Sequence, residues 1–401
     1  MNFTHVLLSS YFYMPLRFGV IVATVVVSIS ILQSGCANTS DGGYPTTAPT
    51  AVPTTTNAPM TNTAPLTTPA PVACNGRKLG TYAWNQTYWR GNDPTLLDFL
   101  DSSVGRQWAC GDLSINIADY SNPDSIHDTG LLVQFIQSYR LRFRDMSTVV
   151  WLTYGDVVEK NGTAMIQFTR TFFNWVSKIP ADVAMSMGTI GISYDVEHLD
   201  PNTTKTALQL AQQLRDATQF ATGKILIQYT IEGDPNVEGT DYVMRYADSA
   251  LAMVYRNYMH DPTGKYQDDS NILNRLMWML TEQCVNCLND SYAIANYKAK
   301  ITVMVEAACK MGASCGKISF CAFDGIDQGA NYMGSVLDQL DSQLVSGGNL
   351  TQAQFNRLIS SSTPYSGHNW EWFRCYAPFS STFQYDSCAD YHQYAAACRS
   401  E

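Results

Sequence analysis

Two carboxylates two positions apart are the residues of this chain best suited to chemistry. Asp195 and Glu197 stand near the end of Gly191–His198, whose small and β-branched residues predict a buried strand. Because side chains alternate faces along a strand, both acids and Ser193 are expected to point the same way. Neighbouring carboxyls oppose each other's ionisation, which keeps one protonated near neutral pH, as a general acid requires. The alternative is a strand running into a solvated loop whose acids happen to alternate.

The elements around this segment predict a closed barrel. From Leu79 onward, short β-rich segments alternate with amphipathic helical segments, which is typical of repeated βα units. Eight such strands predict a (β/α)8 TIM barrel. The connection from Glu306 to Lys317 is too short for a crossover helix, so we expect a loop containing Cys309 and Cys315 there. The predicted strands are Leu79–Trp84, Leu113–Ala118, Thr148–Tyr154, Gly188–Glu197, Lys224–Tyr229, Ser249–Tyr255, Lys300–Glu306 and Lys317–Phe323. The predicted helices are Thr129–Arg144, Thr163–Val176, Thr203–Ala221, Asn271–Cys284 and Asn331–Leu344.

The carboxyl ends of these strands are where a barrel of this class carries its active site. Asp195 and Glu197 end the fourth strand, so we predict both as catalytic residues, and Glu306 ends the seventh strand at the same mouth. An alternative role for Glu306 is a structural ion pair with Arg256. The predicted substrate-binding residues at the strand ends are Tyr82, Trp84, Tyr154, Gln228, Tyr229, Tyr255, Arg256 and Phe323.

The fourth-strand segment resembles the catalytic strand of the chitinase family, glycoside hydrolase family eighteen. The family motif is Asp-Gly-x-Asp-x-Asp-x-Glu and ends in the proton donor. Aligned on that Glu, this chain keeps Gly191, Asp195 and Glu197. Ile190 and Ser193 stand where the family has its first two Asp residues.

Two further segments are similar to motifs of the same family. Met253–Tyr255 resembles Met-x-Tyr-Asp, with Arg256 replacing the Asp, and Phe320–Asp324 stands where the family has its eighth-strand aromatic floor. The resemblance implies that Glu197 is the acid and that Asp195, assisted by Tyr255, orients a substrate N-acetyl group. The acetamide of the substrate is then the nucleophile.

The positions of Glu197 and Glu306 also resemble the wider clan of retaining (β/α)8 glycosidases. That clan carries its acid/base Glu on the fourth strand and its nucleophile Glu on the seventh, so the resemblance implies that Glu306 is a third catalytic residue beside Glu197 and Asp195. A separation of roughly 5–5.5 Å between the two carboxyls would allow double displacement, and roughly 6.5–9.5 Å would suit inversion.

Composition narrows the choice of partner. A net charge of −10 over 401 residues argues against nucleic acid or an anionic membrane surface. The 23 Tyr and 8 Trp offer flat faces for a neutral, hydroxyl-rich carbohydrate. No Gly-rich phosphate loop and no Ser-His-Asp order is present. Cys284 and Cys287 have half-zinc-site spacing without a second pair, so we favour a disulfide framework, whose pairing the sequence leaves open. We expect a carbohydrate partner, no cofactor, no metal, no nucleic acid and a monomer.

The ends of the chain predict an extracellular location. Residues 1–37 resemble a signal peptide, or alternatively a signal anchor that would make the protein a type II membrane protein with an extracellular barrel. Residues 38–73 are rich in Thr and Pro and predict a disordered stalk. Residues 74–348 are the predicted barrel, and 349–401 a Cys- and aromatic-rich C-terminal extension. The ten cysteines after Cys36 predict up to five disulfides. Glycosylation sequons occur at Asn38, Asn85, Asn161, Asn202, Asn289 and Asn349.

These observations lead to a secreted glycoside hydrolase of a polysaccharide or glycan, with Glu197 as proton donor. The alternative is a non-catalytic, chitinase-like carbohydrate-binding glycoprotein. A third hypothesis is a surface structural glycoprotein whose barrel is only a scaffold.

Overall fold

The computed structural model describes the barrel region of the chain. The described residues are 77–91, 93–102, 105–118, 122, 125–143, 148–155, 162–196, 200–231, 237–254, 272–306 and 331–366, without the side chains of 306, 331–333, 365 and 366. All of them belong to one compact unit, Pro69–Glu401. The predicted signal segment, the predicted stalk and residues 367–401 lie outside the described residues.

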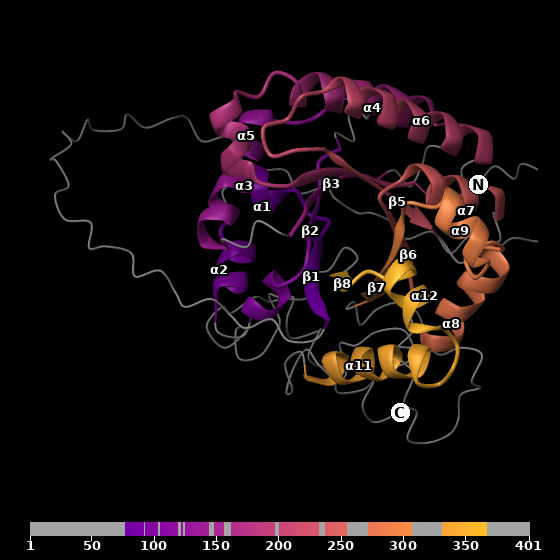
Figure 1. Ribbon diagram of the computed structural model, residues 1–401. Coiled ribbons are helices and arrows are strands. Elements are labelled where there is room, and N and C mark those ends of the chain that lie inside the picture. The colour runs from indigo at the N-terminus through magenta and orange to yellow at the C-terminus, as the bar shows by residue number, and fades with distance from the viewer. Residues whose placement is uncertain are drawn as a thin grey trace, which may run out of the picture. The chain divides into compact units, whose positions relative to one another are not determined.

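Eight parallel strands form a closed barrel (Figure 1), which confirms the predicted (β/α)8 fold. The strands follow one another around the barrel in chain order, and the last pairs with the first. The strands are β1 Lys78–Ala83, β2 Leu113–Asn116, β3 Val150–Gly155, β4 Ile190–Asp195, β5 Leu226–Ile231, β6 Ser249–Met253, β7 Lys300–Glu306 and β8 Ser362–Ser366.

The eighth strand differs from the prediction. Lys317–Phe323 lies outside the described residues, and the barrel is closed by Ser362–Ser366, which pairs with β1 along five residues. This strand carries Pro364, which cannot donate a ladder hydrogen bond and therefore argues against a central strand. β8 pairs with β7 only from Tyr365 onward, one residue after Pro364. At Pro364 itself, β8 therefore pairs with β1 alone. The barrel therefore extends past residue 348, where the predicted C-terminal extension begins.

Helices surround the barrel and cover the outward faces of its strands (Figure 1). Phe168 and Phe172 of α4, for example, belong to the same buried cluster as Tyr154 and Tyr194 of β3 and β4. The helices are α1 Thr87–Arg90, α2 Thr95–Asp101, η1 Gly105–Ala109, α3 Thr129–Arg142, α4 Thr163–Val176, α5 Ala181–Met187, α6 Pro201–Ala217, α7 Val237–Tyr246, α8 Ile272–Trp278, the π-helical turn η3 Met279–Gln283, α9 Asp290–Asn296, α11 Asn331–Val345 and α12 Gln352–Leu358.

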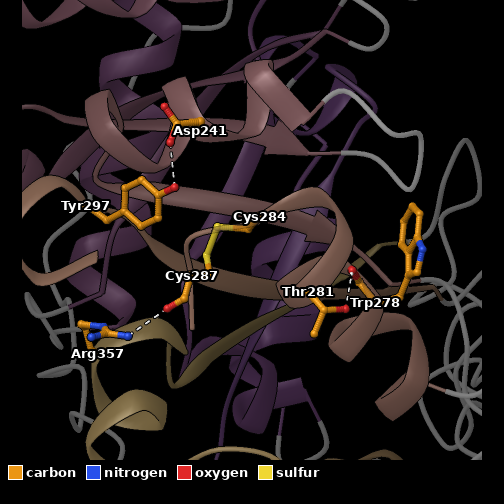
Figure 2. The surroundings of a disulfide bond; sticks show 7 residues. All are labelled: Asp241, Trp278, Thr281, Cys284, Cys287, Tyr297 and Arg357. Atoms are coloured by element: carbon orange, nitrogen blue, oxygen red, sulfur yellow. Dashed lines mark hydrogen bonds between the residues drawn. A yellow bond between two sulfur atoms is a disulfide. The ribbon is translucent and has the colours of Figure 1, made fainter. Parts of the chain in front are cut away.

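A disulfide closes the turn after η3 (Figure 2). Cys284 and Cys287 are bonded to each other, a pairing that the sequence had left open within the expected disulfide framework. Arg357 of α12 donates to the Cys287 carbonyl at 2.9 Å and to the Asp290 carboxyl at 2.9 Å. The turn is therefore anchored to the helix that leads into β8. Cys110 is also disulfide-bonded.

Arg140 ties together the starts of two strands at the amino-terminal end of the barrel. Its buried guanidinium donates to the carbonyls of Thr148, Met187 and Thr189 at 2.8–2.9 Å. These carbonyls precede β3 and β4, so one side chain sets the spacing at which the two strands begin.

Asp112 is a buried acid at the same end of the barrel. Its carboxylate accepts hydrogen bonds from the Val149 N–H at 2.9 Å and from the Trp151 indole at 3.0 Å. Burial raises the pKa of this carboxyl, although the two hydrogen bonds and the charge of Arg140 oppose the shift. The fold therefore favours the protonated form more than water does.

Replacing Asp112 with Asn should change how stability depends on pH. The folded-state pKa lies above the unfolded value of about 3.9, so the ionised form carries a penalty above the folded pKa. That penalty disappears as pH falls toward the unfolded value. In urea unfolding, the wild-type chain should gain stability relative to Asp112→Asn as pH is lowered from 7 toward about 4. Parallel pH profiles for the two proteins would contradict this assignment.

Candidate active site at the barrel mouth

Asp195 lies at the carboxyl end of β4 and faces the barrel interior. The Tyr82 hydroxyl of β1 donates to Oδ2 of Asp195 at 2.8 Å. Because β1 and β4 are not neighbours, this bond has to cross the inside of the barrel. Side-chain alternation then places Ser193 on the same interior face, while Ile192 and Tyr194 face the helices. The predicted orientation of Asp195 and Ser193 is consistent with this geometry.

Aromatic and apolar side chains pack around Tyr82, the hydrogen-bond partner of Asp195. Tyr82, Leu251 and Met304 form a buried cluster, against which Trp84 and Met253 pack with part of their surface exposed. The Tyr82 and Trp84 rings are stacked, with centroids 5.9 Å apart and an interplanar angle of 13°. The barrel mouth therefore offers an aromatic wall beside one oriented carboxyl.

The absence of a side chain at Gly155 leaves room for the Trp84 indole. A Cβ at residue 155 would lie 1.9 Å from Cη2 of Trp84, so any larger residue would displace the ring. Gly155 is also the β3 partner of Asp195 in the ladder. The missing side chain leaves the ring able to lie beside the acid.

A hydrogen-bonded row of uncharged side chains lies deeper in the barrel than Asp195. The Ser193 hydroxyl donates to Oε1 of Gln228 at 2.9 Å, and Nε2 of Gln228 donates to the Ser249 hydroxyl at 3.0 Å. The Ser249 and Thr302 hydroxyls are 3.0 Å apart and share a further hydrogen bond. Gln228 is fully buried within this row, and its role as a substrate-binding residue stays a prediction.

The predicted substrate-binding roles of Tyr154 and Tyr229 do not fit the structure, because both side chains point outward, toward the surrounding helices. The Tyr154 ring packs on Phe168 of α4 with centroids 4.7 Å apart. The Tyr229 hydroxyl donates to the Val196 carbonyl at 3.2 Å and lies 3.4 Å from the Thr204 hydroxyl of α6. The prediction took each residue nearest a strand end, but alternation places the neighbouring residues on the interior face. Tyr229 still contributes from outside, by holding the backbone directly after Asp195.

Four predicted site residues, Glu197, Tyr255, Arg256 and Phe323, lie outside the described residues. Glu306 ends β7 and pairs with Ser366 through its backbone, while its side chain lies outside the description. The separation of Glu197 and Glu306, and the alternative ion pair with Arg256, therefore stay predictions. Within the described part of the chain, no group of three or more His, Cys, Asp or Glu side chains could hold a metal.

Three interior residues at the mouth were missed by the sequence-based prediction. Gly155, Leu251 and Met304 have no chemical signature that distinguishes them from ordinary strand residues. The available signal was the alternation itself, counted along β3, β6 and β7 once their bounds are known.

Comparisons with known proteins show resemblance only in overall structure. No protein-family model matches the chain, and no curated protein matches it. A GH18 chitinase from Pseudoalteromonas aurantia aligns with 9% identity over 74% of this chain and 97% of its own, with a TM-score of 0.36. A chitinase-like agglutinin from Robinia pseudoacacia gives 9% identity over the same two shares and a TM-score of 0.34. A tryptophan synthase A-subunit from Pyrococcus furiosus gives 9% identity over 81% and 99%, with a TM-score of 0.36. Likeness at this level carries no information on chemistry.

The bond between Tyr82 and Asp195 can be measured with a double-mutant cycle. Tyr82→Phe and Asp195→Ala should each destabilise the fold, with a coupling energy of about 1.5–3 kcal/mol, because a hydrogen bond to a charged group is lost. Urea unfolding of the four proteins gives this number. The control pairs Tyr194→Phe with Asp195→Ala, since the Tyr194 hydroxyl contacts Thr169 on the outer face. Equal coupling energies in both cycles would show that the hydrogen bond between Tyr82 and Asp195 does not stabilise the fold.

Proposed function

We propose that this protein is a secreted glycoside hydrolase that acts on a polysaccharide or glycan, with Glu197 as the proton donor. The observation that carries the proposal is the Asp195 carboxyl, held inside the barrel mouth by the Tyr82 hydroxyl and flanked by Trp84. Barrel enzymes of this class carry out their chemistry at this end of the strands. Glu197 is two residues beyond Asp195, so the alternation that points Asp195 inward favours the same direction for Glu197.

The proposed roles follow from what each group can do. The Glu197 carboxyl donates its proton to the glycosidic oxygen as the bond between that oxygen and the anomeric carbon breaks. Asp195, oriented by Tyr82, sits beside it and disfavours its ionisation, which keeps the proton available near neutral pH. The group that attacks the anomeric carbon is Glu306, water or an acetamide of the substrate itself.

The walls of the mouth suit a sugar. Tyr82 and Trp84 form a stacked pair with the indole partly exposed, and a partly exposed aromatic face packs against the apolar face of a pyranose ring. A neutral carbohydrate is also compatible with the net charge of −10.

Secretion is supported by two features of the described residues. The disulfide of Cys284 with Cys287 and the bonded state of Cys110 fit an oxidising compartment. The sequon residues within the described chain are all exposed, as glycan attachment requires: Asn85, Asn202, Asn289 and Asn349. Among the described helices, none combines the length and the apolar character needed to cross a bilayer.

Replacing Glu197 with Gln tests the proposal directly. Because a general acid contributes about 10²- to 10⁴-fold, kcat toward any cleaved glycan should fall by at least about 10²-fold while binding is kept. The screen uses labelled glycosides with and without an N-acetyl group. Glu282→Gln, at an exposed position on η3, is the matched control and should leave kcat unchanged. Undiminished hydrolysis by Glu197→Gln would refute the assigned role.

A second candidate function is carbohydrate binding without catalysis. It is favoured by Ser193, which stands where the chitinase motif has an acid and whose hydroxyl is engaged with Gln228. The hydrogen-bonded row from Ser193 to Thr302 contains no carboxyl group, so it offers no second acid beneath Asp195.

Replacing Trp84 with Ala examines the binding surface that both candidates share. Loss of the stacked indole should weaken oligosaccharide binding about tenfold or more, equivalent to about 1.4 kcal/mol, as measured by isothermal titration calorimetry. Trp175→Ala on the outer helix α4 is the control for general loss of packing. Binding without turnover, unaffected by Glu197→Gln, would select the non-catalytic candidate. Unchanged affinity in Trp84→Ala would exclude this wall as the binding surface.

A further inference from the structure

We infer that the barrel interior beneath Asp195 is a binding site for internal water molecules. The middle of a (β/α)8 barrel is normally filled by bulky branched side chains. Here six consecutive strands each place a hydroxyl or amide side chain at a buried interior position instead. These residues are Ser114, Thr153, Ser193, Gln228, Ser249 and Thr302 on β2 to β7. All six are buried.

The two halves of this layer differ in how their polar atoms are satisfied. From β4 to β7 the side chains bond to one another in the row that begins at Ser193. On β2 and β3, the hydroxyls of Ser114 and Thr153 have no hydrogen-bond partner within the protein, although both residues are 0% exposed. Thr230 of β5 lies one interior position above Gln228. Its hydroxyl also has no hydrogen-bond partner in the described part of the chain, and the residue is 4% exposed.

Three unsatisfied hydroxyls within one barrel are energetically unfavourable. A buried polar group without a partner costs about 1–3 kcal/mol, and folded proteins avoid this cost by pairing such groups with protein or water. Within the described part of the chain, no protein atom pairs with these hydroxyls. Water is therefore the partner that fits a small, closed, polar space.

The space above Thr153 has the right surroundings for such a water. In the ladder, Thr153 is the partner of Ser193, and Gly155 is the partner of Asp195. β3 thus contributes no side chain above Thr153, and the Trp84 ring lies against Gly155. A water on the Thr153 hydroxyl has the Ser193 hydroxyl beside it and lies below the level of Asp195. These groups supply the two to four polar contacts that an internal water makes.

The chemistry of the layer selects water over a metal ion. The six side chains are uncharged, and the described part of the chain contains no cluster of three or more metal-ligating acids, histidines or cysteines. The inference concerns the folded barrel and does not depend on the proposed hydrolase activity.

Thr153→Val in the full chain tests the site, because Val keeps the shape of Thr and removes only the hydroxyl. If the hydroxyl holds a water, its loss should raise the equilibrium constant for unfolding in urea by roughly tenfold. If the hydroxyl is dry and unpaired, the same substitution removes an unsatisfied group and lowers that constant. A lowered or unchanged constant overturns the inference.

A second measurement counts the waters themselves. Oxygen-17 magnetic relaxation dispersion of the native protein should detect long-lived internal waters, and Thr153→Val should lose at least one. Thr169→Val is the matched control, because the Thr169 hydroxyl is buried but bonded to the Met165 carbonyl and to the Tyr194 hydroxyl. That variant should lose none. A wild-type chain with no long-lived water, or an equal count in Thr153→Val, overturns the inference even if the variant's stability changes.

Discussion

The alternation of side chains along the strands of a closed barrel is the constraint on which the structure depends. Each strand residue faces either the barrel interior or the surrounding helices, and a shift of one residue would exchange the two sets. The outward set builds the large apolar core with the helices, as Tyr154 does with Phe168. The inward set is left to form the mouth and the polar layer. Stability and chemistry are thus divided between the two faces of the same strands.

This division explains what could be predicted of the fold. β3 and β7 are nearly continuous apolar or β-branched runs, because a parallel strand is buried on both faces, and such runs stand out in the sequence. β8 does not stand out, because Ser-Thr-Pro-Tyr-Ser has no apolar run and contains Pro364. Its membership of the barrel comes from pairing with β1, which is a long-range interaction that no local pattern encodes.

The candidate site was predictable to the same extent. Asp195 could be found because two acids at i, i+2 share a face whatever the register. The partnership of Tyr82 with Asp195 could not, because it depends on how β1 and β4 face each other across the barrel. Tyr154 and Tyr229 were chosen by their distance along the chain from a strand end, which does not determine the face on which a side chain lies. The identity of an interior residue requires the register, and pairs such as Gly155 with Asp195 are visible only in the folded ladder.

The closure of the barrel by Ser362–Ser366 has a consequence for biosynthesis. β1 pairs with β8, which is synthesised more than two hundred residues later, since Lys78 pairs with Ser362. Until then, the open edges of β1 and β7 and the polar interior are accessible to solvent and to other chains, and unpaired parallel edges favour aggregation. In the folded protein, Arg357 links α12, the helix that leads into this last strand, to the Cys287 turn.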